Sequence, residues 1–227
     1  MKKIILIFLT VGIPLLQVFS QTGSAAFNPN LDVMLKFNEL KLRDPNAYTR
    51  IEGSPYFTDD FVNSKIYFTR GDSVGASIRY DLYKDELEFN RNDQIVYLDK
   101  SYIRKVRMGN ELLEVHKYKL GEEVLTGCFF CIKCGKNSLL KKVSVVFKEA
   151  EGTKGYQDAL PNRFEKNDDE YFLSTEDGQF FKVKNKNDLE INFAGKPEIT
   201  KFIKDNKIKP GKEKDLLKLI DYLNLQK

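Results

Sequence analysis

The sequence predicts an α+β fold, in which an antiparallel β-meander forms a sheet or a partly closed barrel and is followed by a small C-terminal helical cap. Three observations support this prediction. Between residues 56 and 184, short runs of alternating apolar residues are separated by Gly, Asn and Asp pairs, which is typical of strands joined by tight turns. After residue 185 the apolar spacing becomes helical. The chain has 17 Phe and 11 Tyr but no Trp, and aromatic residues of these types favour strands.

Residues 1–20 are typical of a secretory signal peptide. Two lysines precede an apolar run from Ile4 to Val18. Val18 and Ser20 fit the positions that a signal peptidase reads, so we expect cleavage after Ser20, with Ala26 as the alternative. The run is shorter than the roughly 20 residues that a membrane-spanning helix needs, so we expect no transmembrane span after cleavage. The sequence therefore predicts a periplasmic or extracellular protein.

The charge of the chain is nearly balanced. Removal of residues 1–20 takes away two lysines and no acidic residue, which lowers the net charge from +4 to +2. A chain with 31% charged residues of both signs has no strong positive field, so we expect no nucleic acid among its partners.

Residues 21–55 are expected to form a leader that is flexible at its start. Within it, Asn30 can cap a short amphipathic helix. The residues that would share the apolar face of this helix are Leu31, Met34, Leu35 and Leu42.

The β domain is expected to span residues 56–184. Its clearest hairpin runs from Ser77 to Arg91, because the apolar residues on both sides of a Lys84-Asp85 turn fall on one face. A final hairpin pairs residues 171–173 with residues 180–183. Residues 149–161 are rich in glycine and small residues and are expected to form a linker. Further strands are predicted at Gln94–Leu98, Ile103–Met108, Leu112–Tyr118, Val124–Ile132 and Leu139–Lys148.

Residues 185–227 are expected to form the helical C-terminal segment. Asn185 and Asp188 have the spacing of a capping box at the start of a helix. Gly195 fits a helix stop, and Pro197 fits the first turn of a second helix. A last helix is predicted from Lys212 to about Asn224. The apolar stripes of these helices predict that the segment docks on the sheet, with its lysines on solvated faces.

Four segments carry a resemblance to a known family. They are Gly53–Tyr56, Arg79–Phe89, residues 156–159 with Arg163-Phe164, and Lys214–Asn224. In these segments the chain resembles a family of uncharacterised small secreted proteins from Bacteroidetes. The resemblance covers most of the mature chain. It implies localisation in the cell envelope and a β-rich domain with a helical tail, and it implies no catalytic motif.

Cys128, Cys131 and Cys134 form the only dense set of soft ligands in the sequence. They are open to three interpretations: free thiols, one disulfide with a free thiol, or a metal or redox site in which His116 is the fourth ligand. In a strand, Cys128 and Cys134 share one face and Cys131 points to the other, which works against a shared metal. We therefore favour free thiols and predict no metal and no cofactor, with these four residues as the candidate ligands.

Asp81 and Glu88 would lie opposite each other if Lys84-Asp85 formed a two-residue turn. Such a like-charge pair lowers stability unless it is neutralised. We expect neutralisation by Arg79 on the same face or by water, with a calcium ion as the alternative.

No catalytic residue can be assigned from the sequence, because His116 lacks a neighbouring base and an orienting acid. The sequence therefore favours a secreted or periplasmic, non-enzymatic cell-envelope protein that binds an unknown envelope protein or glycan. The alternative is an envelope hydrolase or a thiol or metal protein. It would use the hairpin with Asp81 and Glu88, or the three cysteines.

Overall fold

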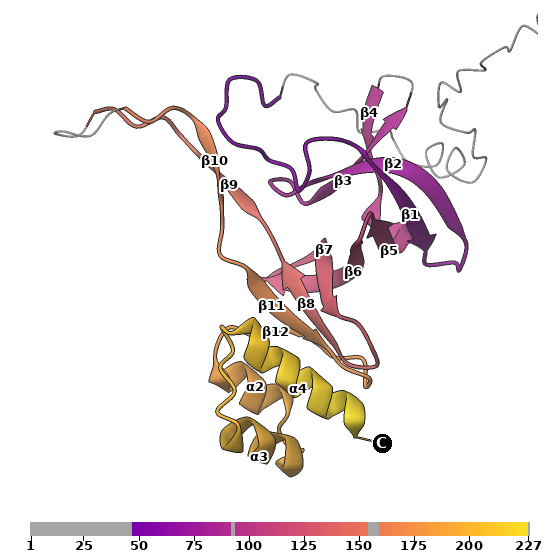
Figure 1. Ribbon diagram of the computed structural model, residues 1–227, viewed down its shortest axis with the longest axis vertical. Coiled ribbons are helices and arrows are strands. Elements are labelled where there is room, and N and C mark those ends of the chain that lie inside the picture. The colour runs from indigo at the N-terminus through magenta and orange to yellow at the C-terminus, as the bar shows by residue number, and fades with distance from the viewer. Residues whose placement is uncertain (1–46, 92–93, 154–158, 227) are drawn as a thin grey trace, which may run out of the picture.

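The computed structural model describes residues 47–91, 94–153 and 159–226, and the structural statements below refer to these residues. Its main feature is a ten-stranded antiparallel sheet in the order β12-β11-β8-β7-β6-β5-β1-β2-β3-β4, and strands β9 and β10 pair separately (Figure 1). The strands are β1 Val62–Phe68, β2 Ser73–Asp81, β3 Glu86–Arg91, β4 Gln94–Tyr97, β5 Ile103–Met108, β6 Glu111–Leu120, β7 Glu123–Lys133, β8 Ser138–Lys142, β9 Val145–Lys148, β10 Arg163–Lys166, β11 Glu170–Ser174 and β12 Phe180–Lys182. The helices are α2 Lys186–Asn192, α3 Pro197–Asp205 and α4 Glu213–Leu225, with a 3-10 helix at Lys100–Tyr102.

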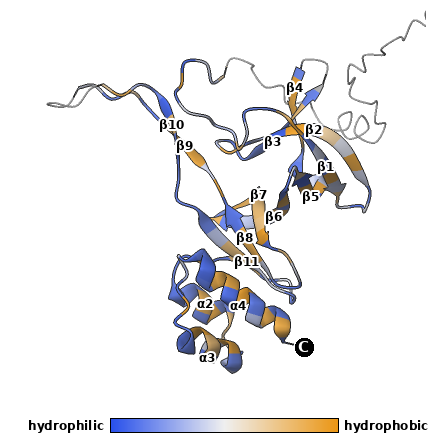
Figure 2. Cartoon of the chain, viewed as in Figure 1, coloured by the Kyte–Doolittle hydropathy of each residue, from blue (hydrophilic) through white to orange (hydrophobic). Residues whose placement is uncertain are grey.

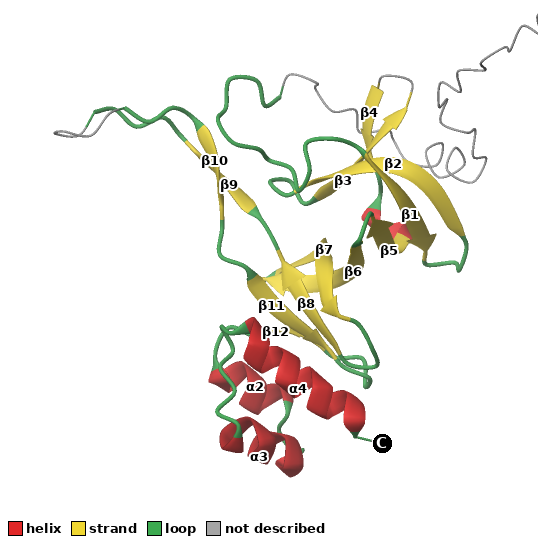
Figure 3. Ribbon diagram, in the orientation of Figure 1, coloured by secondary structure: helices red, strands yellow, loops and turns green. Residues whose placement is uncertain are grey.

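The predicted α+β class is confirmed, and the sheet is open rather than closed into a barrel (Figure 3). The strand order follows the chain as a meander except that β1 lies between β2 and β5. The predicted signal peptide at residues 1–20, the first part of the leader and the short helix after Asn30 lie outside the described residues. Among the described residues, no helix is long and apolar enough to cross a membrane.

The first apolar core is formed mainly by residues of β1 to β7. Tyr80 pairs with Leu87 and Ile78 pairs with Phe89 across the β2–β3 hairpin, and all four side chains are buried there. The shared apolar face that the sequence predicts for this hairpin is therefore confirmed. The other buried members of this core are Ile66, Phe68, Val74, Leu82, Val96, Leu98, Ile103, Val106, Met108, Leu113, Cys128, Phe130 and Val143.

The turn of the β2–β3 hairpin is longer than predicted. Asp81 pairs with Glu86, so four residues connect the strands instead of two. The Asp81 carboxylate accepts hydrogen bonds from the backbone N–H groups of Tyr83 and Lys84, each at 2.9 Å, and Asp85 adopts a left-handed conformation with φ of 56°. An aspartate that binds the following backbone in this way stabilises the longer turn.

Strands β9 and β10 form a ribbon that projects away from the main sheet (Figure 1). The predicted strand Leu139–Lys148 is divided, because β8 stays in the main sheet while β9 pairs with β10. The described parts of the predicted linker at 149–161 instead extend this ribbon, since Glu151 and Leu160 form a further antiparallel bridge.

The second core joins the three helices to the far end of the sheet. Leu139, Leu173 and Val183 from the β region are buried together with the apolar sides of the helices, whose alternating apolar and polar residues are visible in Figure 2. The docking expected from the sequence is confirmed. The helical members of this core are Leu189, Phe193, Ile199, Ile203, Leu216, Leu219, Ile220 and Leu223, with Ile208 from a loop. The capping box of Asn185 and Asp188 is also present.

Candidate functional site

An N-terminal loop, residues 47–61, connects the β2–β3 hairpin to the ribbon. Leu82 N–H donates to the Pro55 carbonyl at 2.7 Å, and Phe164 N–H donates to the Glu52 carbonyl at 2.8 Å. Gly53 makes the close approach to β10 feasible, because it has a φ of +76° and an added Cβ would lie 2.8 Å from the Phe164 carbonyl oxygen. The loop thus places its aromatic residues against both elements.

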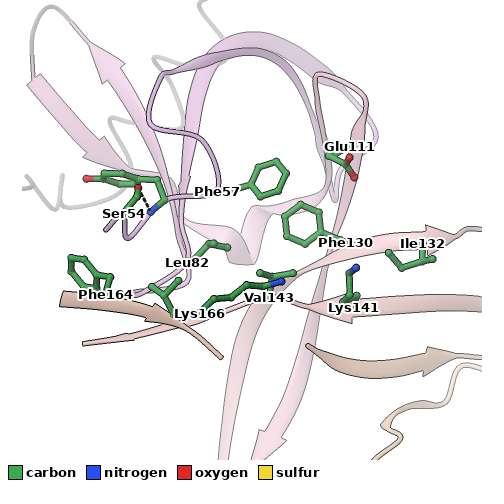
Figure 4. A pocket seen from close by; sticks show the side chains of 12 residues that line it. Ser54, Phe57, Leu82, Glu111, Phe130, Ile132, Lys141, Val143, Phe164 and Lys166 are labelled. Carbon is green, nitrogen blue, oxygen red and sulfur yellow. Dashed lines mark hydrogen bonds between the residues drawn. The ribbon is translucent and has the colours of Figure 1, made fainter. Parts of the chain in front are cut away.

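A cleft of about 620 Å³ lies where the N-terminal loop, β7, β8 and the ribbon meet (Figure 4). Its volume is within the range of about 300–1,000 Å³ that is common for ligand sites. Most of its lining is apolar, and its polar members are Ser54, Glu111, Lys141 and Lys166. The apolar and aromatic members are Tyr56, Phe57, Leu82, Phe130, Ile132, Val143, Val145 and Phe164.

The two lysines that line the cleft are neutralised by acidic neighbours. Lys166 Nζ lies 2.8 Å from an Asp169 carboxylate oxygen. Lys141 Nζ lies 3.5 Å from Asp169 and 3.3 Å from Glu213. The cleft therefore presents apolar side chains, and the lysine charges at its edge are paired with acidic residues. This arrangement favours a ligand that buries apolar groups.

The aromatic rings of the cleft pack against one another and against neighbouring rings outside it. Phe57 lies against Phe130, with ring centroids 4.7 Å apart. Phe164 contacts Tyr48 and Tyr83 at 5.3 and 5.2 Å. Sequence reasoning missed this site, because its residues come from six separate segments and no spacing in the sequence relates them.

Asp81 and Glu88 do not form the predicted opposed pair. Since the turn contains four residues, Glu88 lies opposite Arg79, and the Arg79 Nη2 to Glu88 Oε2 distance is 2.7 Å. Neutralisation of Glu88 by Arg79, which the sequence analysis favoured over calcium, is confirmed. The Arg79 guanidinium also lies 3.7 Å from the centroid of the Tyr56 ring.

Asp81 is fully buried beside the N-terminal loop. The Tyr48 hydroxyl donates to its carboxylate at 2.6 Å. Burial, together with this hydrogen bond, raises the pKa of the Tyr48 hydroxyl. Neither Asp81 nor Glu88 is among the residues that line this cleft.

A buried ionic network links the hairpin turn to β7 and β8. The Asp85 carboxylate lies 2.7 Å from Lys142 Nζ and accepts a 2.7 Å hydrogen bond from the Tyr80 hydroxyl. Lys142 also donates to the Cys128 carbonyl at 3.0 Å, and burial and Asp85 raise the pKa of Tyr80. A Cβ on Gly127 would lie 2.8 Å from Asp85 Oδ2. Sequence reasoning placed Asp85 in a two-residue turn and missed this role.

The three cysteines form one disulfide and leave one free thiol, which was the second interpretation of the sequence. The favoured prediction of three free thiols is wrong. Cys131 and Cys134 form a disulfide with a Cα–Cα distance of 5.8 Å, which is within the usual range for a disulfide. Cys128 is free and buried in the first core. The predicted shared face of Cys128 and Cys134 is also wrong, because the β7–β8 pairing is irregular between Cys131 and Lys133 and brings Cys134 back to Cys131.

His116 lies near the disulfide but on the sheet face opposite Cys128. Its Nε2 atom is 2.9 Å from Glu114 Oε2, and its ring stacks on Phe180 with centroids 4.3 Å apart. The predicted set of four ligands is therefore not brought together, since Cys128 points into the core. Glu114, Cys131 and Cys134 do lie close together, with ligand atoms within 4.8 Å of one another.

Burial of Cys128 makes the stability of the fold depend on pH in the alkaline range. Burial raises the pKa of this thiol from 9.0 to about 12. Between these pH values the folded state retains a proton that the unfolded chain loses. The contribution of the Cys128 thiol to the free energy of unfolding is therefore complete below pH 9 and is lost as the pH rises toward 12. The limiting slope is about 1.4 kcal/mol per pH unit.

We expect Cys128→Ala to flatten the decline of unfolding free energy above pH 9 relative to the wild type. Denaturant unfolding at a series of pH values measures both slopes. Identical slopes for the two proteins would contradict this assignment.

The resemblance to small secreted Bacteroidetes proteins remains a prediction. No protein-family model, no curated protein and no solved structure matches this chain.

Proposed function

We propose that this protein is an exported, non-enzymatic binding protein of the cell envelope that holds an extended polypeptide segment of a partner protein in the cleft. The observation that carries the proposal is the cleft of about 620 Å³ with eight apolar or aromatic side chains in its lining. Aromatic residues supply much of the binding energy at protein interfaces.

The ribbon supports an extended ligand. Among the described strands, β9 pairs only with β10, and Val145 of β9 lines the cleft. An unpaired strand edge next to apolar pockets is the arrangement that binds a peptide by strand addition, because the edge binds the peptide backbone and the pockets bind its side chains.

Two features support export. The signal-like residues 1–20 predict passage into the envelope. The Cys131–Cys134 disulfide fits an oxidising compartment such as the periplasm or the cell exterior.

The binding role is favoured over hydrolysis by the chemistry of the cleft. Among its described lining residues, Glu111 is the one carboxylate and Ser54 the one aliphatic hydroxyl. The Ser54 hydroxyl donates to Asp59 and accepts from the backbone N–H of Tyr56 at 3.1 Å. These bonds hold Ser54 as part of a loop turn.

The proposal is tested by capture of partners from the protein's own envelope extract with tagged wild type and variants. We expect Phe57→Ala and Val145→Asp each to lower partner recovery at least tenfold, since loss of a central contact weakens binding by about 1.4 kcal/mol or more. We expect the captured partners, once they are identified by mass, to be proteins. Ile191→Ala is the matched control, because Ile191 is 63% exposed on α2 and does not line the cleft.

Thermal unfolding of each variant separates lost binding from lost folding. Wild-type recovery with both folded cleft variants would contradict the proposal. Retention of a glycan alone would contradict the assignment of a polypeptide ligand.

A further inference from the structure

A second site lies on the outer face of β6 and β7, apart from the cleft. Glu114 of β6 and Cys131 of β7 are close across the strand pair, and Cys134 follows β7 in the turn to β8. The carboxylate oxygen and the two sulfur atoms lie within 4.8 Å of one another. This is the set of residue types from which proteins build zinc sites.

We propose that Glu114, Cys131 and Cys134 form a redox-gated site for a zinc ion, which is closed by the disulfide and opened when the disulfide is reduced. A dithiol reductant breaks the Sγ–Sγ bond by giving it two electrons and two protons, and the reductant itself becomes a disulfide. Zn²⁺ then binds the two sulfurs as thiolates, and their two protons are released to water.

The distances permit this coordination with small side-chain movements. Zinc binds sulfur at about 2.3 Å and carboxylate oxygen at about 2.0–2.2 Å, so tetrahedral ligand atoms lie about 3.5–4 Å apart. The sulfur atoms must move apart after reduction, and the Glu114 oxygen already lies within 4.8 Å of both. The fourth position is open to water.

His116 acts as a positioning residue for Glu114. Its Nε2 atom lies 2.9 Å from Glu114 Oε2, and its ring stacks on Phe180 at 4.3 Å and meets Phe129 edge-on at 6.0 Å. A histidine fixed in this way orients the ligating carboxylate, as partners of metal ligands commonly do.

The site is accessible from solvent on one side. Cys134 is exposed, whereas Cys131 and Glu114 are half-buried. A reductant and a metal ion can therefore reach Cys134 first. Cys128 is fully buried in the core behind the strand, so it provides an internal control for the cysteines of the site.

The test is a Co²⁺ titration of the full mature chain before and after reduction with a phosphine, followed by displacement with Zn²⁺. We expect a sulfur-to-cobalt charge-transfer band only in the reduced protein, saturating at one ion per chain and lost on addition of zinc. Cys134→Ser should abolish the band, and Glu114→Gln should weaken binding at least tenfold. His116→Gln should weaken it by 10-fold to 100-fold, as loss of an outer-shell partner does. Cys128→Ala should retain wild-type affinity.

Circular dichroism of each protein before titration shows whether it is folded. No charge-transfer band in the folded, reduced wild type would overturn the proposal. Loss of the fold on reduction, an unchanged band in Cys134→Ser, or loss of the band in folded Cys128→Ala would also overturn it. These results are independent of partner capture at the cleft.

Discussion

Asp85→Ala should lower the free energy of unfolding by about 3–5 kcal/mol, the range for removing one member of a buried ion pair. Lys142 is only 7% exposed, and Asp85 lies 2.7 Å from its ammonium group. Loss of the carboxylate therefore leaves a buried positive charge without its counter-ion. The Tyr80 hydroxyl would also lose its 2.7 Å hydrogen bond.

Denaturant unfolding measures the effect of Asp85→Ala. Glu176→Ala is the matched control, because the Lys136–Glu176 pair is exposed on both sides and such pairs contribute about 0–1 kcal/mol. Adding Lys142→Met to Asp85→Ala should recover part of the loss, since it removes the unpaired charge. A loss for Asp85→Ala no larger than that of the control would show that the network does not stabilise the fold.

Leu219→Ala should lower the free energy of unfolding by about 2–5 kcal/mol, as for other buried leucines. Leu219 is fully buried in the core that α4 shares with the sheet. Leu225→Ala in the same helix should change stability by less than about 0.5 kcal/mol, because Leu225 is 81% exposed. Thermal or denaturant unfolding compares the two. Equal effects would mean that α4 is not docked on the sheet in solution.

The elements predicted well from the sequence are those in which the local pattern and the tertiary contacts agree. The predicted strand Ile103–Met108 matches β5, because its inward positions are apolar and its outward positions are charged. Asn185 begins α2 as predicted, since its side chain and that of Asp188 satisfy the first backbone N–H groups without help from distant residues.

The strands that were missed have a weak or interrupted apolar pattern. Strand β1 has a buried Ser64, which interrupts its apolar alternation. Strand β10 has one apolar residue, Phe164, and pairs with β9 beside the N-terminal loop. Local periodicity cannot predict a short polar strand that exists because a distant segment covers it.

The candidate sites also depend on contacts that the local sequence does not reveal. The hairpin sequence indicated that Arg79 would neutralise Glu88, but the length of the turn depended on two hydrogen bonds to Asp81. The cysteine spacing permitted the Cys131–Cys134 disulfide without selecting it, because the choice depends on the irregular β7–β8 pairing near Cys131. The cleft requires six segments to meet, which no local pattern predicts.

The central claim is that a partner polypeptide occupies the cleft, and site-specific photo-crosslinking in the native envelope tests it most directly. A photoreactive phenylalanine replaces Phe57, which is 37% exposed in the cleft lining, or Ile191, which is exposed on α2. We expect a light-dependent adduct with the same partner protein at position 57 and no such adduct at position 191. An adduct confined to position 191, or equal adducts at both positions, would contradict binding in the cleft.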